Sequence, residues 1–321
     1  MTDIKILIDA FGSDNPKVFI EGIAKALREI NNVSLVVVGD KEYIENQLIG
    51  EDFDRNRLEI IHAEQIITND DYPVEAIRKK RKSSLCVGLE TLKIREDIGC
   101  MISAGNTGAV IAGAVLLLGR ASSQDRPTLL TLLPNDKGGF TCLADCGANV
   151  DCKAHHLLKF GEYASDYCKK VLGVKSPRVG LLSVGTEDKK GNAVTKEAFS
   201  LLKQSELNFV GNMESKTALS GDVDVIVADG FWGNVLLKSI EGTTKSVAHR
   251  LYELLKKHSK KEKDMQFVSD AMAELMSILD VSSQGGAILL GTKKPIVKAH
   301  GYATEDTVYN TVRHAIKICK M

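Results

Sequence analysis

A polar turn, Ser103-Ala-Gly-Asn-Thr-Gly108, lies between an apolar run and a segment of small and aliphatic residues that is typical of a helix. Its hydroxyl, amide and backbone N–H groups need partners, because a polar group buried without one costs about 1–3 kcal/mol. The start of a helix offers free N–H groups and the positive end of the helix dipole, so this turn can bind a phosphate or a carboxylate. The spacing is neither that of a P-loop nor that of a dinucleotide fingerprint. An ordinary helix N-cap made by Asn106 or Thr107 is the alternative interpretation.

Other polar residues follow further apolar runs, and in an open parallel sheet ligands bind at the carboxyl ends of the strands. A lysine at such a position can neutralise an anion, and a histidine can act as a general acid, a general base or an oxyanion donor. Each also has a structural alternative: a surface lysine, a histidine that bonds a neighbouring loop, or an aspartate that caps backbone N–H groups. The candidates at these positions are Asp9, Asp14, Asp145, Asn149, Asn192, Lys196, Asp229, Asn234, Lys238, Lys298 and His300.

Two groups of residues raise the question of a metal, and we expect none. Hard oxygen ligands suit magnesium, but the aspartates spread over three strand ends, where loop capping is the better interpretation: Asp9, Asp14, Asp145 and Asp229. A second group has spacing that matches no usual structural zinc site: Cys142, Cys146, Cys152, His155 and His156. A Gly-x-Ser-x-Gly elbow is absent from the sequence, so a serine acyl-enzyme has no support.

The elements that must position these residues are short, continuously apolar strands, which are expected where helices cover both faces of a sheet. Helical spacing with charged outer positions occurs at Lys17–Ile30, Lys153–Leu172 and Glu305–Ile318. The sequence therefore predicts a three-layer α/β/α, doubly wound, mainly parallel sheet. It predicts one catalytic domain spanning 1–321, and a division of that domain into two lobes is the alternative. The predicted strands are Ile4–Asp9, Ser34–Gly39, Leu58–Ala63, Cys100–Ala104, Thr128–Leu133, Phe140–Asp145, Arg178–Gly185, Val223–Asp229 and Ile296–Gly301.

One segment, at about 233–280, departs from the alternation of strands and helices, because its pattern is typical of two long helices with no strand between them. Lysines cluster where the helices join, beside apolar residues. A solvated hairpin or a dimer arm is one interpretation, and a basic amphipathic tip that contacts anionic lipid or an acidic protein is the other. The clustered lysines are Lys256, Lys257, Lys260, Lys261 and Lys263.

The composition is that of a globular chain of 321 residues, 44% of them hydrophobic. Lys plus Arg and Asp plus Glu both number 42, and this zero net charge argues against a dedicated nucleic-acid binder. Seven scattered cysteines are interpreted as reduced thiols, and the start of the chain is typical of a strand rather than of a signal peptide. The longest candidate for a membrane span, Ala109–Leu118, is far shorter than the roughly 18 residues required. We therefore expect a cytoplasmic protein.

The strand-end motifs together resemble the bacterial phosphate acyltransferases of phospholipid synthesis, and the resemblance spans nearly the whole chain. The order and spacing of the motifs carry it: Ile8–Asp14, Ser103–Ala109, Asp125–Pro127, Asp145–Cys152, Val179–Gly185, Lys190–Asn192, Asp229–Val235, Gly285–Gly291 and Lys298–Gly301. There are departures, since the chain has Phe11, Ser13 and Asn15 where the family usually has Met, Gly and His, and Ile288 where it usually has proline. Tyr302 and Ala303 also stand where small hydroxyl residues are common.

The resemblance implies an acyltransferase related in fold to phosphotransacetylases and to isocitrate and isopropylmalate dehydrogenases. It implies a cytoplasmic homodimer with peripheral contact to anionic membrane and no redox cofactor. The implied reaction transfers a fatty acyl group reversibly from acyl carrier protein to inorganic phosphate, and the acyl phosphate then serves glycerol-3-phosphate acylation. A membrane acyl-phosphate:glycerol-3-phosphate acyltransferase is then a further partner, and nucleic acid is not. The alternatives are a phosphate acetyl- or butyryltransferase that uses acyl-CoA, and a noncatalytic membrane-associated scaffold.

For this reaction we expect direct attack of phosphate on the thioester, with no enzyme nucleophile. Lys196 would compensate the charge of the phosphate, His300 would stabilise the oxyanion or protonate the leaving thiolate, and Lys298 would tune the histidine. Phosphate or thioester would contact Ser103, Asn106, Thr107, Gly108, Asp145, Asn149, Asn192, Asp229 and Asn234. Carrier protein is acidic, so basic faces would steer it: Arg78–Lys82 and Lys256–Lys263.

Overall fold

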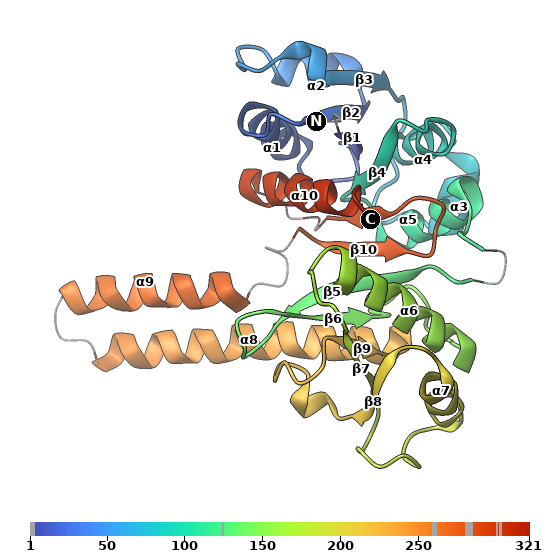
Figure 1. The fold of residues 1–321 in the computed structure, drawn as a ribbon. Helices are drawn as coiled ribbons and strands as arrows, with labels where there is room; N and C mark the ends of the chain where they lie inside the picture. The colour runs from blue at the N-terminus through green and yellow to red at the C-terminus, as the bar shows by residue number, and fades with distance from the viewer. Residues whose placement is uncertain (1–3, 123–124, 259–261, 280–284, 300, 302–303) are drawn as a thin grey trace.

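The computed structural model describes residues 4–122, 125–258, 262–279, 285–299, 301 and 304–321, with side chains from 265 onward in the 262–279 segment. A single sheet of 11 strands crosses the molecule in the order β3-β2-β1-β4-β11-β10-β5-β6-β9-β7-β8 (Figure 1). The strands are β1 Ile4–Asp9, β2 Val33–Gly39, β3 Leu58–His62, β4 Ile98–Ser103, β5 Thr128–Pro134, β6 Phe140–Ala144, β7 Arg178–Leu182, β8 Asn208–Met213, β9 Val225–Val227, β10 Ala287–Leu290 and β11 Ile296–Lys298.

The prediction of a mainly parallel sheet is confirmed. The two outer groups of strands pair in parallel, whereas antiparallel pairing is confined to the middle, where β10 pairs with β11 and β5, and β5 pairs with β6. This central antiparallel stretch joins the two groups into one sheet.

Helices cover both faces of the sheet, as the continuously apolar strands predict. Alternate residues of one strand enter opposite cores: Ile6 and Ile8 pack beneath the α1, α6 and α10 side, and Leu7 packs beneath the α4, α5 and α8 side. The helices are α1 Pro16–Glu29, α2 Lys41–Gln47, α3 Pro73–Lys79, α4 Ser84–Ile94, α5 Thr107–Gly113, α6 Ala154–Lys170, α7 Ala193–Gln204, α8 Gly230–His258, α9 Glu262–Leu279 and α10 Glu305–Ile318.

Two strands were not among those expected from the sequence. β8 carries Asn208, Gly211 and Asn212 and lies at the sheet edge, where two of its six residues are exposed and its apolar pattern is weak. β10 has only four residues and follows Gly285 and Gly286, which both have positive φ. Short edge strands and strands flanked by glycine lack the long apolar run by which the other strands are recognised.

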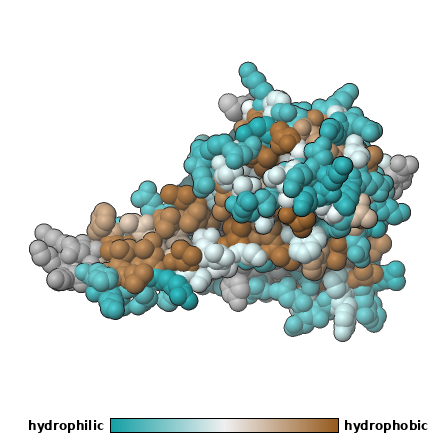
Figure 2. Space-filling model, turned by 90° about the horizontal axis from the view of Figure 1, so that it is seen from below, coloured by the Kyte–Doolittle hydropathy of each residue, from teal (hydrophilic) through white to brown (hydrophobic). Residues whose placement is uncertain are grey.

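The two long helices predicted at about 233–280 are present as α8 and α9, with α8 starting at Gly230, and they project from the body as an arm (Figure 1). A small cluster of Ala248, Val268 and Met272 holds the two helices together. Apolar side chains also remain on the surface of the arm, visible as the brown areas in Figure 2. They include Val247, Leu251, Leu254, Leu255, Phe267 and Ile278. Among the described helices, none has the length and apolar composition that a membrane crossing needs.

Candidate functional site

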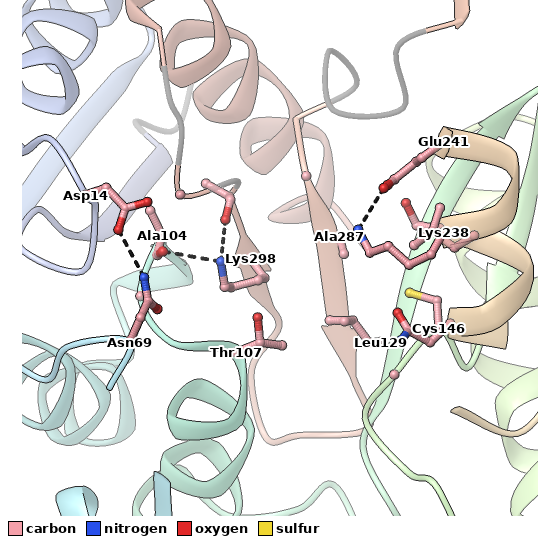
Figure 3. A pocket seen from close by; sticks show the side chains of 18 residues that line it. Asp14, Asn69, Ala104, Thr107, Leu129, Cys146, Lys238, Glu241, Ala287 and Lys298 are labelled. Carbon is pink, nitrogen blue, oxygen red and sulfur yellow. Dashed lines mark hydrogen bonds and ion pairs between the residues drawn. The ribbon is translucent and has the colours of Figure 1, made fainter. Parts of the chain in front are cut away.

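A cleft of about 500 Å³ opens where the carboxyl ends of β4 and β11 meet the loop after β6 and the first turns of α8 (Figure 3). One side of the cleft is polar and is formed by the loops after β1, β3 and β4 and by the end of β11. The other side is formed by α8, β5 and the loop after β6. The lining residues are Asp14, Asn69, Ala104, Gly105, Thr107, Leu129, Thr131, Cys146, Gly147, Asn234, Leu237, Lys238, Glu241, Gly286, Ala287, Lys298, Ala299 and Gly301.

The turn Ser103–Gly108 contributes Thr107 to the cleft lining, together with Ala104 and Gly105. Asn106 is the N-cap of α5, because its Oδ1 accepts from the N–H of Ala109 at 3.0 Å. The capping alternative for Asn106 therefore holds, and its amide also donates to the carbonyl of Asn69. The helical path continues from α5 through the π-helical turn Ala114–Leu118, so the positive end of a helix longer than α5 alone faces the cleft.

Ser103 shapes this turn from inside the protein. Its buried hydroxyl donates to Asp9 Oδ2 at 2.8 Å and accepts from the N–H of Gly105 at 3.2 Å. The β1 loop can approach this closely because Gly12 has no side chain: a Cβ there would lie 2.6 Å from the nitrogen of Gly105. Burial raises the pKa of the Asp9 carboxyl, and hydrogen bonds from Ser84 and Ser103 oppose that shift.

Lys298 reaches the same polar side of the cleft from the end of β11. It lies opposite Ser103 in the parallel β4–β11 pair, and its ammonium group donates to the carbonyls of Ala104 and Ala299 (Figure 3). Burial lowers the pKa of Lys298 to about 8, while the nearby carboxylates of Asp9 and Asp14 act in the opposite direction. A half-buried lysine beside a helix start is a good binding group for a small anion.

Asn69 is a lining residue that the sequence analysis missed. Its side-chain amide donates to Asp14 at 3.0 Å, and its carbonyl accepts from Asn106. Asn69 precedes α3 in a polar loop with no recognisable motif, so only its position in the fold brings it to the cleft. Glu241 was missed for the same reason: it lies inside α8 and pairs with Lys238 at 2.7 Å.

Asp145 and Asn149 lie behind the cleft and organise the loop after β6. The Asn149 side chain donates both to Asp145 and to the carbonyl of Pro127. Burial raises the pKa of Asp145, and the hydrogen bonds from Asn149 and the loop oppose this. Both Asp145 oxygens accept backbone hydrogen bonds, from the N–H groups of Leu129, Gly147, Ala148 and Asn149.

Helix α8 packs directly on this loop through two glycines. A Cβ on Gly233 would lie 1.8 Å from the carbonyl oxygen of Asp145, and one on Gly230 would lie 2.6 Å from the carbonyl oxygen of Asn149. This contact places Asn234 in the cleft lining. Asp229 caps α8, since its carboxylate accepts from the N–H of Trp232 at 2.8 Å.

The remaining predicted residues do not join this cleft within one chain. Asn192 caps α7 and lines a second, more apolar cavity of about 720 Å³ on the other side of α8, while Lys196 is an exposed residue of α7. Gly108 lies against Pro73 rather than in the lining. His300 lies outside the described residues, although its neighbours Ala299 and Gly301 both line the cleft.

The basic run Arg78–Lys82 is largely neutralised by acidic neighbours. Its partners form the pairs Lys79–Glu75, Lys80–Asp71, Arg81–Glu90 and Lys82–Glu64. This run is therefore less positive than its sequence suggests. Of the other basic run, Lys256 and Lys257 lie at the end of α8, whereas Lys260 and Lys261 lie outside the described residues.

The described residues contain no group of three or more His, Cys, Asp or Glu side chains arranged to hold a metal. Within that part of the chain, the lysine, the helix start and the surrounding amide and hydroxyl groups equip the cleft to bind a small anion next to an apolar wall.

Comparison with known proteins gives the family and the fold of the chain. The chain matches the model of the fatty acid synthesis protein family over residues 4–321. It is 42% identical to a phosphate acyltransferase of Clostridioides difficile (strain 630), over 99% of this chain and 93% of that protein. It is 41% identical to a phosphate acyltransferase of Bacillus licheniformis, over 97% and 93% of the two chains.

Among solved structures, a phosphotransacetylase from Streptococcus pyogenes superposes with a TM-score of 0.65 at 16% identity, covering 99% of this chain and 93% of the other. A structure described as a putative 4-hydroxythreonine-4-phosphate dehydrogenase from Salmonella typhimurium follows with a TM-score of 0.56 at 14% identity, covering 99% of both chains. These two likenesses confirm the predicted fold class. The family match and the long, closely related sequences show that the chain belongs to the phosphate acyltransferase family of fatty acid synthesis proteins and is an acyltransferase.

Proposed function

We propose that this enzyme transfers a fatty acyl group reversibly from acyl carrier protein to inorganic phosphate, giving acyl phosphate for glycerol-3-phosphate acylation in phospholipid synthesis. The observation that carries the proposal is the convergence of Lys298 with the helix start at Thr107 in one cleft. Two sources of positive potential at one point suit an anion such as phosphate. The chain would work as one catalytic unit, with the arm as an extension of it.

In the proposed reaction, a phosphate oxygen attacks the thioester carbonyl, and the tetrahedral oxyanion collapses with loss of the pantetheine thiolate. Lys298 and the N–H group of Thr107 would hold phosphate, and Asn234 would orient the thioester from α8. His300 would stabilise the oxyanion or protonate the thiolate. Catalysis would rest on holding the reactants in line and on donors preorganised around the developing charge.

The other predicted residues take different parts in this proposal. Ser103, Asn106, Asp145, Asn149 and Asp229 would act on substrate through the loops that they hold, because their hydrogen bonds run to neighbouring backbone and side chains. Asn192 would contact the substrate from the apolar cavity on the other side of α8, and Lys196, exposed on α7, would act from outside that cavity. That cavity falls in the size range of ordinary ligand sites, roughly 300–1,000 Å³, and its apolar wall favours a fatty rather than an acetyl group.

The decisive test offers phosphate together with thioesters of acyl carrier protein and of coenzyme A, each with acetyl, butyryl and palmitoyl chains. We expect acyl phosphate from the palmitoyl carrier protein at a higher kcat/KM than from any coenzyme A thioester. The product is measured as its hydroxamate, and a reaction without phosphate is the control. Faster turnover of acetyl- or butyryl-CoA would instead identify a phosphate acetyl- or butyryltransferase, and absence of acyl phosphate with every thioester would favour a scaffold.

The arm supports two further parts of the proposal. Val247, Leu251, Leu254 and Leu255 follow the spacing of one helical face, and they stay partly or fully exposed in a single chain. A second copy of the chain would cover this apolar surface in a homodimer. Lys256 and Lys257 at the end of α8 would contact anionic lipid, so that a cytoplasmic enzyme reaches the membrane and its membrane acyltransferase partner.

If the end of α8 meets lipid, vesicle flotation should depend on charge. We expect binding to phosphatidylglycerol vesicles that weakens as salt rises from about 50 to 500 mM, because salt screens surface charge. The double change Lys256→Glu and Lys257→Glu should abolish it, whereas Lys169→Glu with Lys170→Glu, an equal charge change at the end of α6, should not. Equal binding to neutral vesicles in high salt would refute the electrostatic contact.

A further inference from the structure

A pair of thiols joins the C-terminal helix to the sheet at the opposite end of β4 from the cleft. Cys100 lies within β4 and is fully buried, and Cys319 follows α10 and is partly exposed. Their sulfur atoms are 3.2 Å apart, although the two residues are 219 positions apart in the chain. Gly99 makes room for this contact, since a Cβ there would lie 2.6 Å from the Cys319 sulfur.

Cys319 can be reached from outside. It lines a cavity of about 280 Å³ together with Lys293, Lys294 and the C-terminal Met321. This cavity is separate from the cleft that contains Thr107 and Lys298, and it has no part in the proposed acyl transfer. Cys319 lines this cavity and Cys100 does not, so a small uncharged oxidant that enters it reaches Cys319 before Cys100.

The surroundings favour the thiolate of Cys319 over that of Cys100. The hydrogen bond between the two thiols lowers the pKa of Cys319, burial opposes this, and the positive charge of Lys294 lowers it further. The same hydrogen bond and complete burial raise the pKa of Cys100. The thiolate is the reactive form of cysteine, so the accessible member of the pair is also the more nucleophilic one.

We propose that Cys319 is a peroxide-reactive thiol and that Cys100 is its resolving partner. The Cys319 thiolate attacks one oxygen of a hydroperoxide, the O–O bond breaks, and Cys319 becomes a sulfenic acid while the other oxygen leaves as water or alcohol. The Cys100 sulfur then attacks Cys319, expels water and forms the disulfide. With hydrogen peroxide, two thiols and one peroxide give one disulfide and two waters.

The disulfide would tie the end of α10 to β4. Both elements lead to the cleft, because β4 continues into the Ser103 turn and α10 begins a few residues after Lys298. Crosslinking residues that are so far apart in the chain restricts the unfolded state strongly. The oxidised enzyme should therefore unfold at a higher temperature than the reduced one.

The other cysteines provide internal controls. Cys142 and Cys168 are also a close pair, with sulfurs 3.1 Å apart, but both are buried, so peroxide has no direct approach to them. Cys152 is partly exposed, yet burial and nearby aspartates raise its pKa to about 12, which keeps it in the unreactive thiol form.

The experiment treats the reduced full-length enzyme with one to five equivalents of hydrogen peroxide, blocks remaining thiols and maps the peptides without reduction. We expect a 2 Da mass loss located in a Cys100–Cys319 crosslink, and a higher Tm that dithiothreitol reverses. Cys319→Ser should remove both effects, and Cys152→Ser should retain both. The peptide map of the wild-type enzyme tests the proposal even if a variant folds poorly. Oxidation of Cys152 or of the Cys142–Cys168 pair before Cys319 would overturn it. Sulfinic acid at Cys319 without a crosslink to Cys100 would also overturn it.

Discussion

Replacing Lys298 by methionine is expected to lower kcat/KM for phosphate by roughly 10²–10³-fold, the range seen when one preorganised donor is removed from a site that stabilises negative charge. Methionine keeps most of the length and the apolar contacts of the lysine stem but removes the charge and the donor. The measurement is acyl phosphate formation at varied phosphate concentration. Most of the loss should appear in KM for phosphate if Lys298 mainly binds it, and in kcat if it acts mainly on the transition state.

Lys294→Met is the matched control. Lys294 is also partly buried with a lowered pKa, and it also donates to two backbone carbonyls, those of Arg95 and Ile98, but it lies at the other end of β4. It should leave kcat/KM nearly unchanged. His300→Ala, assayed in parallel, should reduce kcat with little change in KM for phosphate. Full activity of Lys298→Met would mean that phosphate binds elsewhere.

The pKa of Lys298 predicts an opposite pH dependence for function and for stability. Burial lowers this pKa from 10.5 to about 8, so the charged form needed for phosphate is lost as pH rises through 8, and activity should fall there. The unfolded chain binds the proton more tightly between pH 8 and 10.5, and the folded state therefore gains stability across that window. Relative to Lys298→Met, the wild type should gain on the order of 2–3 kcal/mol between these pH values, measured by urea unfolding.

Gly233→Ala should be the most damaging single methyl group that can be added to α8. The new Cβ would lie 1.8 Å from the carbonyl oxygen of Asp145, which is backbone of the loop that Asp145 and Asn149 hold in place. The helix and the loop must then separate, so we expect a loss of stability of about 3 kcal/mol or more, at the upper end for overpacking. Asn234 would move with the helix, and acyl phosphate formation should fall together with the thermal midpoint.

Gly242→Ala provides the comparison within the same helix. A Cβ at Gly242 has open space around it, and alanine favours a helix over glycine by about 1 kcal/mol. This variant should raise the thermal midpoint slightly and leave activity unchanged. If Gly233→Ala instead behaved like Gly242→Ala, the close packing of α8 on the Asp145 loop would not exist in solution.

Most of the sheet could be predicted because buried parallel strands carry continuous apolar runs, such as Val33–Gly39, which is buried throughout. β8 and β10 escaped because an edge position and flanking glycines weaken that pattern. The site residues also differ in whether a local sequence pattern marks them. Lys298 and Thr107 follow recognisable strands, whereas Asn69 and Glu241 lie in a loop and within a helix that carry no local sign of a ligand.

The sequence by itself determined the fold class, the long helical arm and the order of the strand-end motifs, because hydrophobic periodicity and glycine placement are local properties. Only the tertiary structure decided which motifs meet. It joined Thr107, Lys298 and Asn234 in one cleft, and it placed Asn192 on the other side of α8. It also made Asp145 the centre of a loop, since its hydrogen-bond partners come from β5 and from its own turn. The order of the strands and the close contacts at Gly12 and Gly233 determine which loops lie next to one another. Neither is a property of any short segment of the sequence.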